Sequence, residues 1–494
     1  MEAVSIMDIT DLQRRNMEVS LSQELQISMV TSSLVTLNIC PNLVQIYSVF
    51  KSEYKEPESW KLQSHEIYSA AIGSAQRYKI KSKKDGNYQY IRMEFCTGGD
   101  VEHIIRVSKQ LPIPTVRSYL FQMCYALYSC RVELDLRHYD IKLLNFFATN
   151  GLSLFNQSSS AYRALTRSGL ATDQDKFINI RVGLGQAIYS LLINSQNNEL
   201  IKLADFGTSL IGMKGLGEAI TMEQFTTLEN TPIEFLLLGS DARQSFSSDT
   251  FCLGLAFLHL MTGYEPYEEL LKDVHCPEYL RDRLKTYYTT DDSTSPYFVI
   301  SELMACVDTS ITDDGMQEFV LYDTLYRYLV LFGFSCKMDV IYPNNVVYQT
   351  LYSALLDTSY PSTTVLEYEK LRQCRQQWRR DREHWSVHLG NNPVMINLRQ
   401  RMSHLGTGSM ALFESMVDFD PSRRCSMLEA LHHPIFNCYI DDQGNYDSEM
   451  TITDDVGSAG NVRRQRSSSG TIYFNKSYMH YHRSGNTSDS LPYR

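Results

Sequence analysis

Two short polar motifs that lie far apart in the chain constrain its fold more than any other feature of the sequence. The segment from His138 to Asn145 reads His-Tyr-Asp-Ile-Lys-Leu-Leu-Asn, and the segment from Leu203 to Gly207 reads Leu-Ala-Asp-Phe-Gly. Between them they supply two carboxylates, one ammonium group and one carboxamide. A fold that uses these groups together must bring the two segments side by side.

The four groups match the needs of phosphoryl transfer. That reaction requires a carboxylate that orients the attacking hydroxyl, a cation near the transferred phosphate, and an amide and a second carboxylate that hold magnesium. The residues that meet these needs, in that order, are Asp140, Lys142, Asn145 and Asp205. At these residues the chain resembles the eukaryotic protein kinases, and a lysine two positions after the first aspartate is the pattern of the Ser/Thr-specific members.

An upstream segment from Met93 to Asp100 resembles the hinge between the two kinase lobes. The resemblance makes Met93 the residue at the back of the adenine pocket. It also implies that Glu94 and Cys96 offer backbone groups to the adenine edge and that Asp100 faces the ribose. The expected cofactors are therefore ATP and magnesium, and the expected partner is a protein substrate.

Downstream segments extend the resemblance to Phe436. Pro232-Ile233-Glu234 is similar to the Ala-Pro-Glu motif, and Asp249 begins a segment similar to the buried central helix of kinases. The resemblance implies that Asp249 fixes the backbone of the catalytic loop by accepting its hydrogen bonds. It also implies that Arg424 pairs with Glu234.

The resemblance implies an α+β, bilobal kinase-like fold with a truncated N-lobe and a largely helical C-lobe. Small-molecule kinases related to choline and aminoglycoside kinases share part of the first motif, but Lys142, the Asp-Phe-Gly sequence and the His-Pro-Ile-Phe end argue against them. The expected divisions are a partial N-lobe at 1–96 with the hinge at 94–97, a C-lobe at 97–438 with insertions at about 149–198 and 291–406, and a disordered tail at 439–494.

The front of the chain departs from the kinase pattern. Kinases bind the nucleotide phosphates with a glycine-rich hairpin and a third-strand lysine, which a glutamate from the next helix holds. Here the first glycine is Gly73 and the first lysine is Lys51, and both follow the segment that resembles that helix. Apolar spacing predicts the helix between Ser20 and Ile39, with Leu21, Leu25, Met29, Val30, Leu34 and Leu37 on its apolar face.

Glu24 is our choice for the ion-pair glutamate of this helix, and Glu18 is the alternative. Both lie further from Pro41 than the kinase spacing, so an ordinary surface glutamate also stays open. Two explanations fit the missing phosphate clamp: an incomplete enzyme chain, or a pseudokinase that acts as a scaffold or allosteric regulator. Retention of all four catalytic groups favours the first, and either chain should bind ATP weakly.

Composition limits the function classes. The 494 residues are 43% hydrophobic and 21% charged, which is typical of globular proteins. A net charge of -11 argues against a general nucleic-acid binder. The sequence shows neither a signal-peptide pattern nor an apolar run long enough for a bilayer, so we expect no membrane partner. Eleven cysteines without Cys-x-x-Cys spacing indicate reduced thiols in a cytosolic or nuclear protein.

The two insertions and the tail carry further expectations. In the first insertion, Phe177 to Ile193 alternates as strands do, and in the second, Phe319 to Phe334 is an apolar helical stretch. The arginines between Glu367 and Trp385 predict either a basic docking face or a solvated helix with internal charge pairs. In the tail, Ser467–Ser469 follow several arginines and form a candidate phosphorylation site.

Tyr139 stands where switchable kinases have the arginine that receives an activation-loop phosphate. Without that charge, a phosphate on Thr226 would lack its main partner. The resemblance further implies that Thr227 contacts Asp140 and Lys142. It also implies that the His138 and Phe206 rings stack in a buried column.

Overall fold

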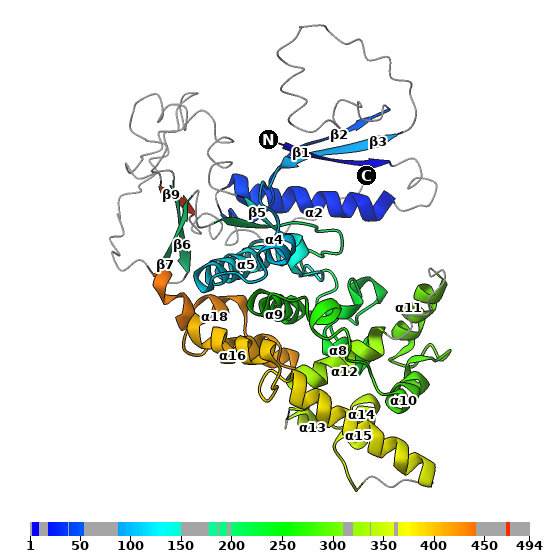
Figure 1. Ribbon diagram of the computed structural model, residues 1–494. Coiled ribbons are helices and arrows are strands. Elements are labelled where there is room, and N and C mark those ends of the chain that lie inside the picture. The colour runs from blue at the N-terminus through cyan, green and yellow to red at the C-terminus, as the bar shows by residue number, and fades with distance from the viewer. Residues whose placement is uncertain are drawn as a thin grey trace, which may run out of the picture.

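The computed structural model describes residues 2–8, 18–37, 39–53, 87–149, 177–184, 187–194, 199–309, 320–335, 337–359, 364–440 and 471–474. The fold is mixed α+β and predominantly helical, with small sheets, as the sequence predicted for the fold class. Figure 1 shows one sheet and the helix α2 above a larger helical part.

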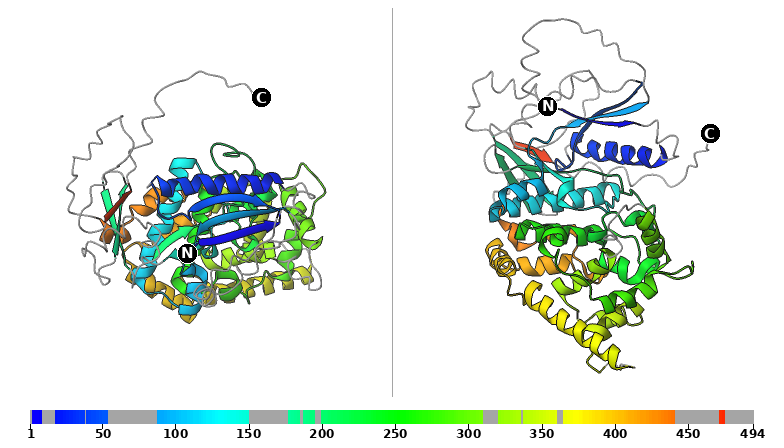
Figure 2. Two further views of the ribbon diagram at one scale, coloured as in Figure 1. Left: turned by 90° about the horizontal axis from the view of Figure 1, so that it is seen from above. Right: turned by 45° about the vertical axis from the view of Figure 1, so that its right-hand side comes forward.

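The upper part is a three-stranded antiparallel sheet with α2 beside it. Its strand order is β1-β3-β2, and Figure 2 shows α2 running along the strands when they are seen from above. Its elements are β1 (Glu2–Asp8), α2 (Glu18–Thr36), β2 (Ile46–Ser52) and β3 (Tyr88–Glu94).

The predicted helix between Ser20 and Ile39 is confirmed as α2, but the predicted apolar face is partly wrong. Met29 is 52% exposed and Leu37 is 57% exposed, whereas Ile27, Thr31 and Leu34 are buried. The buried stripe includes a hydroxyl residue that apolar counting omits. Thr31 Oγ1 satisfies itself locally by donating to the Ser28 carbonyl at 3.0 Å, so it can be buried without an orphaned polar group.

The helical part is built from many short and medium helices. Three short strands belong to it and form one sheet: β4 (Gly99–Asp100), β5 (Phe146–Thr149) and β8 (Leu200–Leu203). The helices are α4 (Val101–Ser108), α5 (Ile113–Leu134), α8 (Ile233–Leu238), α9 (Ser247–Thr262), α10 (Glu278–Tyr288), α11 (Phe298–Thr309), α12 (Val320–Phe332), α13 (Met338–Ile341), α14 (Val346–Leu355), α15 (Val365–Trp385), α16 (Pro393–Leu405), α17 (Ser409–Met416) and α18 (Met427–Leu431).

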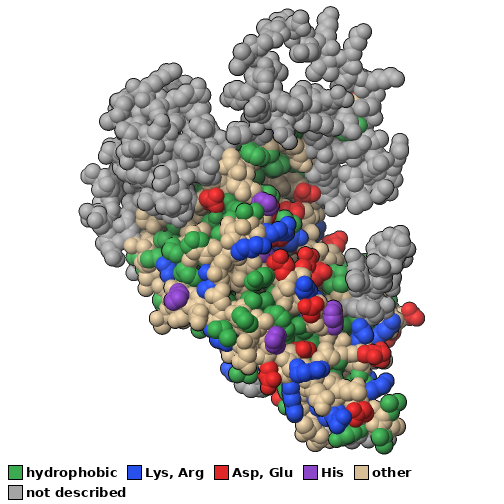
Figure 3. All heavy atoms as spheres, in the orientation of Figure 1, with side chains coloured by type: hydrophobic (Ala, Val, Ile, Leu, Met, Phe, Trp, Pro, Cys, Tyr) green, Lys and Arg blue, Asp and Glu red, His purple; other side chains and the backbone are tan. Residues whose placement is uncertain are grey.

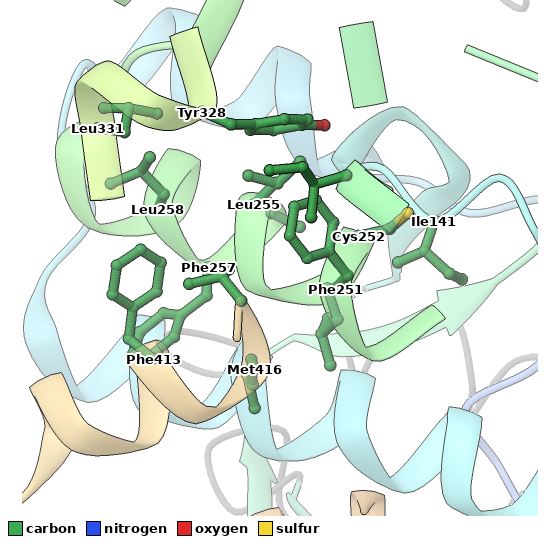
Figure 4. Packing of buried hydrophobic residues seen from close by; sticks show 14 of the residues in the cluster. Ile141, Phe251, Cys252, Leu255, Phe257, Leu258, Tyr328, Leu331, Phe413 and Met416 are labelled. Atoms are coloured by element: carbon green, nitrogen blue, oxygen red, sulfur yellow. The ribbon is translucent and has the colours of Figure 1, made fainter. Parts of the chain in front are cut away.

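The helix α9 lies at the centre of the core, as the resemblance implied for the segment that begins at Asp249. Figure 4 shows its side chains packed between α12 and α17. The Phe251 ring meets Tyr328 of α12 at 5.2 Å between centroids, and the Phe257 ring meets Phe413 of α17 at 5.9 Å. At Gly254 an added Cβ would lie 2.5 Å from Val417 Cγ1, so only glycine permits this close packing.

The predicted pairing of Arg424 with Glu234 is confirmed, and it links the end of the chain's core to α8. Two parallel contacts of 2.8 and 2.5 Å join the guanidinium to the carboxylate, and both groups are buried. The Arg424 guanidinium also lies 4.7 Å from the centre of the Phe251 ring. The ion pair therefore packs against the core helix α9.

The first insertion contains the predicted strands, β6 (Phe177–Leu184) and β7 (Ala187–Asn194), paired as an antiparallel hairpin. A third strand, β9 (Thr471–Phe474), adds to β6 in parallel. These four residues lie within the stretch 439–494 that we expect to be a disordered tail. The candidate phosphorylation site at Ser467–Ser469 lies outside the described residues.

In the second insertion, the helix predicted from Phe319 to Phe334 is confirmed as α12. Of the α15 arginines, Arg372 forms an internal charge pair with Glu369 at 2.9 Å, and two others bond to neighbouring helices. Arg375 donates to the Ser353 carbonyl near the end of α14, and Arg382 donates to the Val330 carbonyl near the end of α12. Cations stabilise the partial negative charge of helix C-termini. Over this region Lys and Arg side chains are mixed with Asp and Glu side chains (Figure 3).

Among the helices that the structure describes, none combines the length and the apolar character that a membrane crossing requires.

The buried Arg424–Glu234 pair should dominate the stability of the helical part. We expect Glu234→Gln to lower the free energy of unfolding in urea by about 3–5 kcal/mol, because it leaves a buried guanidinium without a charged partner. The matched control is Arg423→Ala, which removes a more exposed guanidinium 3.6 Å from Asp418 and should cost less than about 1 kcal/mol. Equal losses in the two variants would contradict this assignment.

Burial of His259 in α9 predicts a pH dependence of stability. Burial lowers the pKa of its imidazole from 6.5 to about 4, so the folded state resists a proton that the unfolded chain accepts. Neutral His259 therefore costs the folded state nothing above pH 6.5. As the pH falls from 6.5 toward 4, the free energy of unfolding decreases by about 3 kcal/mol. Urea unfolding of His259→Gln should show a smaller loss over this interval than the parent, while His404→Gln, at an exposed position, should behave like the parent.

Candidate functional site

The segment around Asp140 is held by the buried carboxylate of Asp249 at the start of α9. The backbone N–H groups of His138 and Tyr139 each donate to one Asp249 oxygen at 2.8 Å, as predicted. Burial raises the pKa of the Asp249 carboxyl, and the two backbone donors and the charge of nearby basic groups oppose this rise. Tyr139 has a φ of 64°, a strained conformation for a non-glycine residue that this anchoring stabilises.

Asp140 lies at the centre of a network of polar side chains. One carboxylate oxygen accepts from Thr227 Oγ1 at 2.7 Å, and the other lies 3.0 Å from the Lys142 ammonium. Lys142 also donates to Thr227 Oγ1 at 3.0 Å, so the predicted contacts of Thr227 are confirmed. Burial raises the pKa of Asp140, but the bonds from Thr227 and Lys142 outweigh burial and hold that pKa below its usual value.

Asn145 joins this network from the short turn Leu143–Asn145. Its Nδ2 donates to the Asp140 carbonyl at 2.8 Å and to the Asp140 carboxylate at 3.0 Å. The Asn145 carbonyl accepts from the Ala204 N–H at 3.0 Å, so the two motifs lie side by side. The carboxamide is thus oriented with Nδ2 toward Asp140, and Oδ1 is the atom that can serve a cation.

The Asp-Phe-Gly segment packs against the catalytic loop through rings. The Phe206 and His138 rings are in contact as predicted, with centroids 5.3 Å apart, but their planes are tilted by 55° rather than stacked. His138 Nε2 contacts the Ala204 carbonyl at 3.1 Å. Asp205 has a φ of 61° and an exposed side chain. The strained backbone turns its carboxylate away from the buried column of rings.

Glu24 faces Asp205. An added Cβ at Gly207 would lie 3.4 Å from Asp205 Oδ1 and 3.7 Å from Glu24 Oε2, so two carboxylates flank this glycine. Burial raises the pKa of Glu24, and the charge of Asp205 raises it further. The helix α2 therefore directs our chosen glutamate toward Asp205. The side chain of Glu18, the alternative, lies outside the described residues.

The strand β1 carries a residue that the sequence analysis missed. Its register with β3 aligns Ala3 with Met93 and Ser5 with Ile91, so Ala3 and Ser5 share one face of the sheet with Met93. The kinase pattern Val-Ala-x-Lys places alanine and lysine with this same spacing on the strand before the glutamate-bearing helix. The segment Glu2-Ala3-Val4-Ser5 matches it at the alanine and has Ser5 at the lysine position.

The hinge residues have partners that the sequence did not predict. The Glu94 N–H already donates to the Gln45 carbonyl at 2.8 Å, so it cannot also serve a ligand. The Cys96 carbonyl accepts from Gly99 N–H at 3.2 Å. Asp100 Oδ1 accepts from the His103 N–H at 2.7 Å and caps α4. Because these atoms already have partners, only the remaining polar atoms of Glu94, Cys96 and Asp100 could bind adenine or ribose as expected.

The segment after Gly207 is ordered by Arg137, another residue that the sequence analysis missed. Its buried guanidinium donates to the Gly212 carbonyl at 3.0 Å and to the Lys214 carbonyl. Thr226 Oγ1 donates to the Tyr139 carbonyl at 2.7 Å. Arg137 therefore binds the backbone carbonyls of this segment directly, and no phosphate is needed for the contact. In the sequence, only the position of Arg137 just before His138 could have suggested this role.

No known protein family has a model that matches this chain, and no curated protein matches it. The function must therefore be argued from the geometry. Across the described ranges, His, Cys, Asp and Glu side chains form no group of three or more that could hold a metal ion. The candidate set here is one carboxylate, Asp205, and one carboxamide, Asn145, both of which offer the oxygen ligands that magnesium prefers.

Because Arg137 binds the segment directly, order in that segment should not depend on Thr226 phosphorylation. We expect phosphatase-treated parent and untreated parent to show the same amide hydrogen exchange over residues 208–231. Arg137→Leu should speed exchange near Gly212 by about tenfold, equivalent to 1.4 kcal/mol of local stability. A tenfold increase caused by phosphatase alone would show that a phosphate supplies the order.

Proposed function

We propose that the chain is a protein Ser/Thr kinase that transfers the γ-phosphate of ATP to protein hydroxyls. In this proposal the sheet β1-β3-β2 with α2 and the helical part are the two lobes of a kinase-like fold. The observation that carries the proposal is the network in which Thr227, Lys142 and Asn145 all bond to Asp140. These bonds hold the pKa of the Asp140 carboxyl below its usual value, and carboxylates perturbed by specific partners are enriched at functional sites.

Each residue of the network has a chemical role in this proposal. Asp140, kept ionised by its partners, orients the acceptor hydroxyl and accepts its hydrogen bond. The Lys142 ammonium stabilises negative charge that develops on the transferring group. Thr227 holds both side chains in place, so little reorganisation is needed during the reaction.

The proposed cofactors fit the site unequally. Asn145 Oδ1 and Asp205 would hold magnesium, which when bound neutralises charge on the nucleotide phosphates. The phosphates themselves have fewer protein donors than in kinases, because Ser5 stands at the lysine position and the first glycine of the sequence is Gly73. We therefore propose that ATP binds weakly and that transfer is slow.

A second candidate function is a pseudokinase that acts as a scaffold or regulator. The observation that favours it is the pair of carboxylates, Glu24 and Asp205, that converge on Gly207 while Ser5 replaces the lysine. Two adjacent carboxylates repel an anionic phosphate unless a cation lies between them.

Restoring the missing cation distinguishes the two functions. We expect Ser5→Lys to raise both the affinity for Mg·ATP and the rate of radiolabel transfer to a generic protein substrate by at least tenfold, about 1.4 kcal/mol. The new ammonium would stand at the position that the kinase pattern gives to the phosphate-binding lysine. Transfer by parent and variant should disappear in Asp140→Asn and Asp205→Asn.

The matched control is Val4→Lys, which adds the same charge to the opposite face of β1. It should leave affinity and rate at the parental values. If Ser5→Lys binds Mg·ATP no better than the parent, and any transfer survives Asp140→Asn, the kinase proposal is wrong. Improved binding without transfer would favour the pseudokinase.

A further inference from the structure

Lys202 on β8 is a fully buried lysine with every ammonium donor engaged. Its Nζ lies 2.7 Å from Glu94 Oε2, and the two side chains are each 2% exposed. The same Nζ donates to the Pro41 carbonyl at 3.1 Å and to the Leu43 carbonyl at 3.2 Å. An ammonium has three protons, so these three acceptors satisfy it completely.

These bonds join three segments that are distant in the sequence. Pro41 and Leu43 lie in the loop after α2, Glu94 ends the hinge strand β3, and Lys202 lies directly before the Asp-Phe-Gly segment. The Glu94 carboxylate also accepts from the Gln45 N–H at 3.3 Å. The hinge end of the sheet is therefore tied to the loop and to β8 through one pair of charges.

The loop after α2 is also fixed to the helical part by neutral bonds. Asn42 Nδ2 donates to the Ile201 carbonyl at 2.7 Å and to Gln122 Oε1 of α5 at 2.9 Å. The Leu203 N–H donates to the Asn42 carbonyl at 2.9 Å. Lys202 therefore connects a loop that is anchored on α5 with the strand that ends in the hinge.

A buried ion pair is poorly suited to stability alone. Removing two charges from water costs several kcal/mol per ion, and well-packed apolar side chains often stabilise as well or better. The bonds to Lys202 are directional, however, and they persist only while loop, hinge and β8 keep one arrangement. We therefore expect this pair to determine the relative geometry of the three segments rather than the overall stability of the fold.

We propose that Lys202 and Glu94 are positioning residues that fix the hinge and the loop after α2 relative to β8. They tie the upper part to β8, the strand that directly precedes Ala204 and Asp205. This inference rests on the proposed function for its consequence, which is the orientation of the nucleotide cleft. The positioning itself is independent of any ligand.

The test replaces the charged pair with apolar groups. The variants are Lys202→Met, the milder Glu94→Gln, and the double variant Lys202→Met/Glu94→Leu, which leaves no charge buried alone. The control is Lys51→Met, which removes an exposed lysine on β2. Hydrogen exchange is measured at the Val44, Gln45 and Leu203 amides and, as an internal reference, at amides of α9.

We expect exchange at the three amides to accelerate at least tenfold relative to the α9 amides in all three pair variants, the double variant included. Lys51→Met should leave the ratio unchanged. Binding of Mg·ATP should weaken by about fivefold or more in the double variant, which a purely stabilising pair would not cause once the protein is folded.

Equal acceleration at both sets of amides would mean that the pair contributes only to overall stability, and parental exchange in the double variant would mean that packing alone holds the segments. Either result overturns the proposal. If the parent fails to bind Mg·ATP, the proposed function is wrong, but the exchange ratio still decides whether Lys202 positions the hinge.

Discussion

The two hydrogen bonds from the catalytic loop to Asp249 are the interaction on which the rest of the site depends. They hold Tyr139 in a left-handed conformation, and this turn directs the next residue, Asp140, toward its polar partners. Asp249 can act as a fixed anchor because α9 is surrounded by α12 and α17 in the core. Apolar burial in the helical part thus fixes the orientation of one largely buried polar loop.

Contacts between recognisable motifs could be predicted from the sequence because each motif fixes its own local geometry. The pairing of Arg424 with Glu234 and the bonding of Thr227 to Asp140 follow from motif order, although the partners are distant in the chain. Helix positions followed from apolar spacing. The buried face of α2 did not, because Thr31 satisfies its hydroxyl within the helix and is buried like an apolar residue.

Contacts that depend on strand register or on a single side chain could not be predicted. The position of Ser5 is set by the pairing of β1 with β3, which aligns Ser5 with Ile91. These two strands are far apart in the sequence, so the sequence does not reveal their register. Lys202 reads as one polar residue in a short strand, and nothing local indicates that its ammonium bonds the hinge and a loop. Arg137 is similar, since its acceptors are backbone carbonyls, which any residue provides.

The site is consequently uneven, and the unevenness has a physical cause. Around Asp140, several charge-assisted and neutral bonds keep the carboxylate ionised and oriented. Around Gly207, the carboxylates of Glu24 and Asp205 bring negative charge together. Electrostatic stabilisation in a cleft requires charge of the opposite sign to the reacting group. In the proposed function, a cation beside Glu24 and Asp205, rather than the network around Asp140, is therefore what decides whether phosphate groups can bind.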